Sequence, residues 1–157
     1  MPRGEDGPRA EVGRLFDQYG AALYRYALMI LADPAAAEDA IQQVFTALLS
    51  RARSIEQAEH YLRRAVRNEC YSALRRRMQR GEGSPLLEAV GPETKPDERL
   101  ALERAIRGLP PDQREVLHLH AFEGRTFQEI ADLTDESMNT IASRYRYAVT
   151  KLRRMLT

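Results

Sequence analysis

The sequence predicts an all-α protein of two small helical domains joined by a flexible linker, the C-terminal one a helix-turn-helix. Apolar residues recur with helical spacing along most of the chain, and no segment alternates with the two-residue period of a strand. The stretch 79–97 contains three Gly, three Pro and few periodic apolar residues, which is typical of a linker. The length of 157 residues and the apolar fraction of 43% suit one medium domain or two small ones.

The first half of the chain is expected to begin with a disordered N-terminus, 1–9, because this stretch is polar. A first helix then spans about 10–31. Asp33 and Pro34 follow as an N-cap and a first helical residue, so a second helix starts there. The apolar residues of this second helix that should face the core are Ala37, Ile41, Val44, Phe45 and Leu48.

A third helix is predicted from a capping-box pattern formed by Ser54 and Gln57. Its helical pattern extends to about Met78, where the linker composition begins. The first domain is therefore expected to span 10–78.

The net charge of +1 conceals a strong segregation of charge along the chain. The stretch 61–80 holds seven Arg and one Glu, and the stretch 144–157 holds four Arg and one Lys without an acidic residue. Between them, 82–103 carries six acidic residues against two basic ones. Two basic segments around an acidic one indicate two polyanion-binding surfaces, although solvated helix faces would give the same pattern.

The third helix interleaves basic and aromatic side chains. Basic side chains neutralise phosphates, and aromatic rings stack on exposed bases with about 1–3 kcal/mol per base. This combination favours capture of a single strand, while the alternative is that Tyr61 and Tyr71 pack into the core and the arginines are solvated. The residues near one line along the helix are His60, Arg64, Arg67, Tyr71 and Arg75, and those on the packed side are Leu62, Ala65, Val66, Cys70 and Ala73.

The second domain, 98–157, is predicted to contain a helix-turn-helix. Thr126 and Glu129 form a capping box that opens one helix, and Ser137 can cap the next. This last helix suits a DNA major groove, because one side is apolar and the other carries Arg, Asn, Ser and Thr; an ordinary amphipathic surface helix is the alternative. Its apolar stripe is Ile141, Tyr145, Ala148, Leu152 and Leu156, and its opposite face is Asn139, Ser143, Arg146 and Thr150.

Other classes of function find little support in the sequence. No Gly-rich phosphate loop, nucleophile elbow or metal motif is present, so we expect no enzyme, no cofactor and no metal site. The three histidines, His60, His118 and His120, are scattered, and a core position is expected for the single cysteine, Cys70. Without an apolar run long enough to span a membrane, we expect no membrane insertion and a cytoplasmic location.

The order of these elements resembles a known family. The segments EDAIQQVF, YLRRAVRNECYSALRRR and LPPDQREVLHLHAFEGRTFQEIA, followed by the basic helix, are similar to those of an ECF-type (extracytoplasmic function) sigma factor. Such proteins are small promoter-recognition subunits of bacterial RNA polymerase with one domain on each side of a linker. The resemblance covers 15–78 and 100–156.

The resemblance implies partners and contact residues. The partners are core RNA polymerase and promoter DNA, both as duplex and as melted strand, and an anti-sigma factor is a further candidate. The segment 50–61 corresponds to the part that captures an unstacked base of the −10 element. By residue, the polymerase contacts are Asp39, Gln42, Gln43 and Phe45; the −10 contacts are Tyr61, Arg64, Arg67, Asn68, Tyr71 and Arg75; and the −35 contacts are Asn139, Thr140, Ser143, Arg144, Arg146 and Tyr147.

The sequence departs from the family pattern at several of these positions. Tyr61 replaces the usual Trp, and Tyr147 stands where a second Arg is usual after Arg144. Polar Thr134 and Glu136 occupy a turn that is commonly apolar, so we expect a looser helix-turn-helix. Asn139 replaces a frequent Gly.

Two other functions remain compatible with the helical pattern. A stand-alone helix-turn-helix regulator would bind DNA without polymerase, and an adaptor would bind polymerase without reading promoters. The acidic and amide-rich second helix distinguishes the first alternative, because a stand-alone regulator does not need it. The basic positions of the last helix distinguish the second.

Overall fold

The computed structural model describes residues 7–50, 56–81 and 98–157. These ranges contain α-helices and one short π-helix, with no strand among them, so the predicted all-α class is confirmed. The chain divides into two compact units, 1–82 (unit 1) and 83–157 (unit 2). The division lies within the stretch that we predicted as a linker, of which 82–97 falls outside the described residues.

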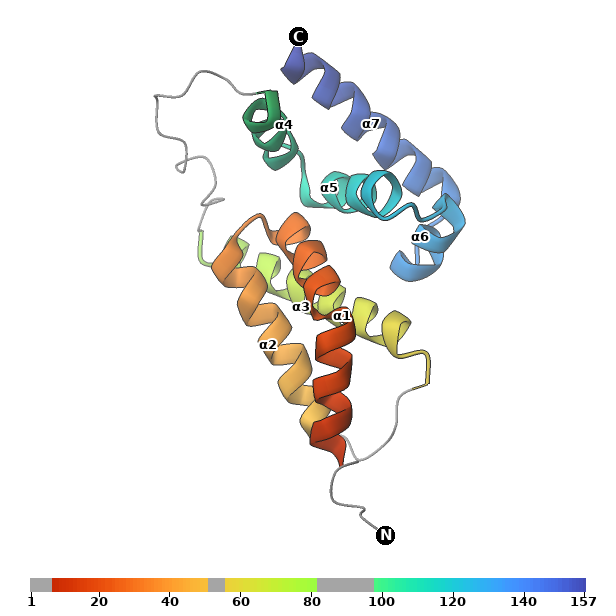
Figure 1. Cartoon of the computed structure of the whole chain (residues 1–157). Coiled ribbons are helices and arrows are strands. Elements are labelled where there is room, and N and C mark those ends of the chain that lie inside the picture. Colours follow the sequence, from red (N-terminus) through yellow and green to blue (C-terminus); the bar gives the residue numbers. More distant parts are fainter. Residues whose placement is uncertain (1–6, 51–55, 82–97) are drawn as a thin grey trace. The chain divides into compact units, whose positions relative to one another are not determined.

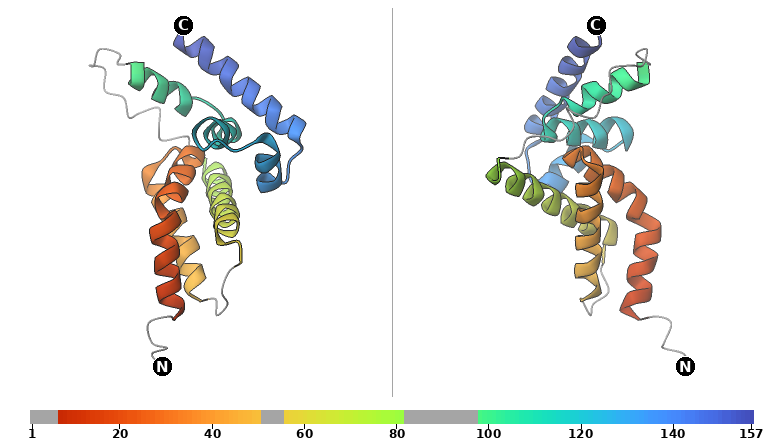
Figure 2. Two further views of the ribbon diagram at one scale, coloured as in Figure 1. Left: turned by 45° about the vertical axis from the view of Figure 1, so that its right-hand side comes forward. Right: turned by 90° about the vertical axis from the view of Figure 1, so that its left-hand side faces the viewer.

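Unit 1 is a bundle of three long helices: α1 (Pro8–Leu31), α2 (Pro34–Leu49) and α3 (Ala58–Gln79). Each helix packs against the other two, and all three lie side by side in Figures 1 and 2. All five residues predicted to face inward from α2 are buried. The largest side chains enclosed by the bundle are Leu23, Tyr26, Ile30, Leu31, Leu62 and Val66.

The joint between α1 and α2 is built as the sequence indicates. Ala32 adopts a left-handed conformation (φ 54°) that ends α1, and Asp33 caps α2 by accepting hydrogen bonds from the backbone N–H groups of Ala35 (3.1 Å) and Ala36 (3.3 Å). The other carboxylate oxygen of Asp33 lies 3.0 Å from Nη2 of Arg77, in the last turn of α3. One side chain therefore both starts α2 and connects it to the far end of α3.

Two predicted boundaries in unit 1 differ from the structure. Pro8 and Arg9 were expected in a disordered N-terminus, but α1 begins at Pro8, because proline suits the first turn of a helix; residues 1–6 lie outside the described part. Gln57 is the N-cap of α3 with φ 52° and makes no side-chain cap, so it does not take part in a capping box. Ser54 lies outside the described residues.

Unit 2 contains shorter helices that pack around α7. The apolar stripe predicted for α7 is largely confirmed, since Ile141, Ala148 and Leu152 are buried, but Leu156 at the end of the helix is exposed. The elements are α4 (Glu98–Arg107), α5 (Pro111–Leu117), the π-helical turn η2 (His118–Phe122), α6 (Phe127–Thr134) and α7 (Met138–Leu156).

Both predicted caps of the helix-turn-helix are confirmed. Glu129 N–H donates to the Thr126 hydroxyl (3.1 Å), and Thr126 N–H donates to the Glu129 carboxylate (3.0 Å), which completes the capping box of α6. The Thr126 backbone hydrogen bond is the main cause that lowers the pKa of Glu129 from its usual value, and the Thr126 side-chain hydrogen bond adds to it. Ser137 caps α7 by accepting from the N–H of Thr140 (3.1 Å).

The turn between α6 and α7 is not loosened by its polar residues, contrary to our expectation. The Thr134 hydroxyl is buried and donates to the carbonyl of Ile130 (2.8 Å), so its hydrogen-bonding group is satisfied. Asp135 follows in a left-handed conformation that ends α6. Glu136 forms an ion pair with Arg144 of α7 (3.3 Å), which connects the turn to the helix it precedes.

Candidate nucleic-acid and protein interfaces

The solvent-facing side of α2 carries carboxylates and amides without a basic residue. Among the predicted polymerase contacts, Asp39, Gln42 and Gln43 are exposed on this face. Phe45 is not: its side chain is 7% exposed and packs edge-on against Phe16 of α1, with ring centroids 5.2 Å apart. The prediction that Phe45 faces the core is therefore confirmed, and its ring lies beneath the exposed face of α2, while Phe16 is 51% exposed.

The predicted −10 contacts lie along one side of α3. Asn68 and Arg75 are exposed, and Tyr61, Arg64, Arg67 and Tyr71 are half-buried. The guanidinium carbon of Arg67 lies 4.6 Å from the ring centroid of Tyr71, and Arg75 donates to the hydroxyl of Ser72 (2.9 Å). A cation over an aromatic ring places a phosphate-binding group beside a stacking surface, which is the combination that single-strand binding uses.

The remaining arginines of α3 serve the interior of unit 1 or face α2. Arg63 is only 3% exposed; its guanidinium lies over the ring of Tyr26 (4.7 Å) and 3.5 Å from Glu59. Arg77 is tied to Asp33 as described above. The basic segment predicted from the sequence is therefore not one polyanion-binding surface, because its arginines point in several directions.

Three of the six predicted −35 contacts on α7 are exposed. Asn139, Arg146 and Tyr147 are exposed, and Thr140 and Ser143 are half-buried. The guanidinium of Arg146 lies 5.7 Å from the ring centroid of Tyr147. Arg146, Asn139 and Tyr147 combine a phosphate or guanine donor with an amide and a ring, which are groups that contact base edges and backbone in a groove.

Arg144 differs from the other predicted −35 contacts. Its side chain is 22% exposed, its Nε lies 3.3 Å from the Asp112 carboxylate in the first turn of α5, and its Nη2 lies 3.3 Å from Glu136. The guanidinium therefore connects α5, the turn and α7. In this arrangement Arg144 holds the start of α7 against α5 and does not extend toward solvent with the other residues.

An aromatic cluster holds the other flank of α7. The ring of His120 lies 4.4 Å from Phe127 and 4.7 Å from Tyr145, and its Nδ1 hydrogen bonds with the carbonyl of Arg125 (2.8 Å). His118 faces the interior and pairs with Glu123 through Nε2 (2.9 Å). Both histidines lie in the π-helical turn η2, which is closed by the hydrogen bond from Glu123 N–H to the His118 carbonyl. Although they are two residues apart, His118 pairs with Glu123 and His120 packs against Phe127 and Tyr145.

Metal-ligand clusters and membrane-spanning helices are both absent from the residues that the structure describes. No group of three or more His, Cys, Asp or Glu side chains in these ranges could hold a metal ion. No helix within the described part of the chain combines the length and the apolar character that crossing a membrane requires. Cys70 is buried in the core of unit 1.

Comparison with known families places both units. Residues 15–80 match the family "Sigma-70 region 2", and residues 99–152 match "Sigma-70, region 4". The chain belongs to the sigma-70 family. The two matched regions together account for most of its length.

Individual relatives agree with this family. The chain is 30% identical to the probable RNA polymerase sigma factor RfaY of Xanthomonas campestris pv. campestris over 95% of its own length, but it spans only 42% of that protein. It is 29% identical to the ECF RNA polymerase sigma factor SigL of Mycobacterium tuberculosis, covering 88% of this chain and 85% of SigL.

A solved structure shares the fold. It is the sigma factor RpoE in its complex with the anti-sigma factor NepR from Bartonella quintana. The match has a TM-score of 0.71 and 23% identity, and it covers 93% of this chain and 96% of that one.

Proposed function

We propose that this sigma factor binds core RNA polymerase through the exposed face of α2 and directs it to promoters by contacting the −10 element with α3 and the −35 element with α7. The observation that carries the proposal is the separation of surfaces within unit 1. An acidic and amide face without basic residues lies on α2, and a basic and aromatic face lies on α3. The first is complementary to protein and the second to a polyanion.

In the polymerase contact, Asp39, Gln42 and Gln43 supply the hydrogen-bonding groups. Phe45 acts indirectly, since its packing against Phe16 fixes the position of α2 against α1. Amides and one carboxylate give a polar contact whose strength depends on matching groups of the partner rather than on buried apolar area.

At the −10 element, α3 stabilises an opened strand. Extracting a base from the stack costs a few kcal/mol, which stacking on an aromatic ring and phosphate contacts must offset. Tyr61 and Tyr71 offer the rings, and Arg64, Arg67 and Arg75 offer the cations, with Asn68 exposed between them.

At the −35 element, α7 reads duplex DNA in the major groove. Asn139, Thr140, Ser143, Arg146 and Tyr147 face the groove, and Arg144 holds the helix at its angle. Because both units belong to one chain, binding of one element raises the effective concentration of the other unit at its own element.

The sigma-70 family is not a family of enzymes, and we propose that the polymerase performs all the chemistry, in the cytoplasm and without a cofactor bound to this chain. An anti-sigma factor is a reasonable regulatory partner, since the similar RpoE structure was obtained with one. Such a partner would compete for the surfaces described above.

Run-off transcription with purified core polymerase and a pool of randomised promoters tests the proposal. The intact chain should select a set of templates that share two elements, and the double variant Asp39→Arg/Gln42→Ala should lose core binding with an unchanged circular dichroism spectrum. Specific duplex binding by the chain alone, combined with no affinity for core polymerase, would instead identify a stand-alone regulator.

A further inference from the structure

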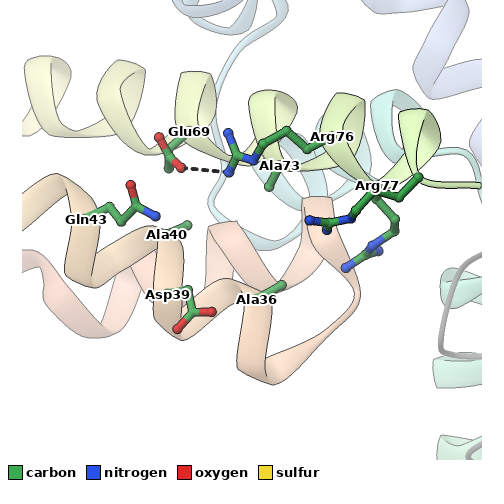
Figure 3. A pocket seen from close by; sticks show the side chains of 9 residues that line it. Ala36, Asp39, Ala40, Gln43, Glu69, Ala73, Arg76 and Arg77 are labelled. Carbon is green, nitrogen blue, oxygen red and sulfur yellow. Dashed lines mark hydrogen bonds and ion pairs between the residues drawn. The ribbon is translucent and has the colours of Figure 1, made fainter. Parts of the chain in front are cut away.

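A groove lies between α2 and α3 in unit 1, with a volume of about 230 Å³ (Figure 3). Its floor consists of three alanines, Ala36 and Ala40 of α2 and Ala73 of α3. Because these side chains are small, the two helices leave open space between longer polar side chains. The polar residues around this space are Asp39 and Gln43 from α2, Glu69, Arg76 and Arg77 from α3, and Arg80, the C-cap of α3.

The arginines of this groove lie on a different face of α3 from the predicted −10 contacts. Ala73, Arg76 and Arg80 are spaced by three and four residues, so they share one face of the helix. At 3.6 residues per turn, this face is roughly opposite the one that carries Arg64 and Tyr71. Arg76 and Arg80 therefore face α2 and its exposed carboxylate and amides.

Arg76 and Arg80 differ from Arg77, although all three line the groove. Arg77 is largely buried by its ion pair with Asp33, so it forms part of the wall. The Arg76 side chain is 51% exposed although its Nη2 lies 3.2 Å from Glu69, and a guanidinium has further N–H groups to donate. Arg76 can thus keep its bond to Glu69 and receive a second acceptor.

The size of the groove limits what can occupy it. Pockets for drug-sized ligands and cofactors are about 300–1,000 Å³, which is larger than this groove. A volume of about 230 Å³ leaves room for one or two side chains.

We propose that the groove extends the polymerase-docking face and accepts an acidic side chain of core RNA polymerase, bound by Arg76 and Arg80. The inference rests on the proposed function, since it assigns a second charge contact to the same docking face. Asp39 and Gln43, on the opposite wall, bind a neighbouring basic or amide group of the partner. A DNA phosphate is a poorer occupant, because the groove borders the α2 face through Asp39 and Gln43, whereas the predicted −10 contacts lie on the opposite side of α3.

The test measures the equilibrium affinity of the full-length chain for core polymerase by fluorescence anisotropy at two salt concentrations. Arg76→Glu/Arg80→Glu should weaken binding at least about tenfold, with a smaller loss at high salt, because the reversal places like charges together. The matched control Arg9→Glu/Arg25→Glu makes the same charge change at exposed positions of α1 and should bind within about twofold of the parent.

A neutral pair, Arg76→Gln/Arg80→Gln, guards against an effect on folding. A negative charge near the C-terminus of α3 opposes the helix dipole, whereas glutamine does not, so the neutral pair separates loss of the contact from loss of the helix. It should weaken core binding less than the reversal does, with the thermal midpoint of the parent chain retained.

The outcomes separate this inference from the proposed function. If Asp39→Arg loses core binding while the Arg76/Arg80 reversal binds like the control, the groove contact is overturned and the α2 docking face stands. If neither variant changes core affinity, the docking face itself fails. If the reversal keeps core affinity but loses promoter opening, the groove holds a DNA phosphate, and the inference is again overturned.

Discussion

The two basic helices, α3 and α7, carry similar charge but distribute it differently. On α3 one arginine is buried, others line the groove toward α2, and others face outward with Tyr71. On α7 the basic residues are exposed, except Arg144, which ion pairs on the flank. In the proposed function, α3 is therefore shared between the interior, a protein partner and an opened DNA strand, whereas the exposed side of α7 contacts only duplex DNA.

The two helices also differ in how their N-terminal ends are capped. α3 follows Gln57, which adopts a left-handed conformation and makes no side-chain cap. α7 follows a capped turn, with Ser137 at its start and the Thr126 box one helix earlier. Local hydrogen bonds therefore fix the start of α7, which the proposed reading of base edges by this helix requires.

The largest expected effect comes from breaking one unit while sparing the other. Leu62→Ala removes a fully buried side chain of α3 and should destabilise unit 1 by about 2–5 kcal/mol. Denaturant unfolding should show this loss, and core binding should weaken, while −35 duplex binding by unit 2 persists. Ile141→Ala, in the core of α7, is the reciprocal variant. Simultaneous loss of both activities in either variant would contradict independent units.

A smaller effect is expected at the first cap of the helix-turn-helix. Thr126→Ala removes the hydroxyl that accepts from Glu129 N–H, and losing an N-cap of this kind costs about 1 kcal/mol. Thermal unfolding of the chain should show a lower midpoint for unit 2 only. Thr126→Ser keeps the acceptor and should restore most of the loss.

Arg144 and Arg146 should separate positioning from reading. Arg146→Ala should leave stability unchanged. It should reduce the slope of log binding constant against log salt concentration for the −35 duplex by about one, as expected for one lost phosphate contact. Arg144→Ala should destabilise unit 2 by up to about 1 kcal/mol through its two ion pairs, with little change of salt slope. Equal salt slopes for parent and Arg146→Ala would remove Arg146 from the DNA contact.

The smallest effect concerns pH. The pKa of Glu129 is lowered in the folded chain, so its carboxylate stabilises the fold above the unfolded pKa, and this contribution disappears as pH falls through the folded pKa. In Glu129→Gln the stability of unit 2 should therefore fall less as the pH is lowered. The stabilities of the parent and the variant should become equal at low pH. Unfolding midpoints measured across the acid range check this.

Features that depend on neighbours in sequence could be predicted, and those that depend on distant pairs could not. Asp33, Thr126 and Ser137 cap helices through residues two or three positions away, so the sequence alone indicates them. Arg144 meets Asp112 of another helix, and Arg77 meets Asp33 from 44 residues away, so neither pairing has a local signal.

The same limit explains the corrections at individual side chains. Helical spacing predicts which residues share a face of α3, but it does not predict that Arg63 stacks on Tyr26 of α1. Helical spacing placed Phe45 inward and the family resemblance placed it among the contacts, and the packing of its ring against Phe16 agrees with the inward position. Thr134 and Glu136 were expected to weaken the turn between α6 and α7 because they are polar. Instead, the hydrogen bond of Thr134 and the ion pair of Glu136 stabilise this turn.

The carboxylate of Asp33 has a wider consequence. One of its oxygens fixes where α2 begins and the other fixes how near the last turn of α3 can come. This ion pair therefore contributes to the spacing of the two walls that hold Asp39 and Arg76, although Asp33 does not line the groove itself. In the proposed function, a substitution of Asp33 should change how well unit 1 fits core polymerase without altering any of the proposed contact residues.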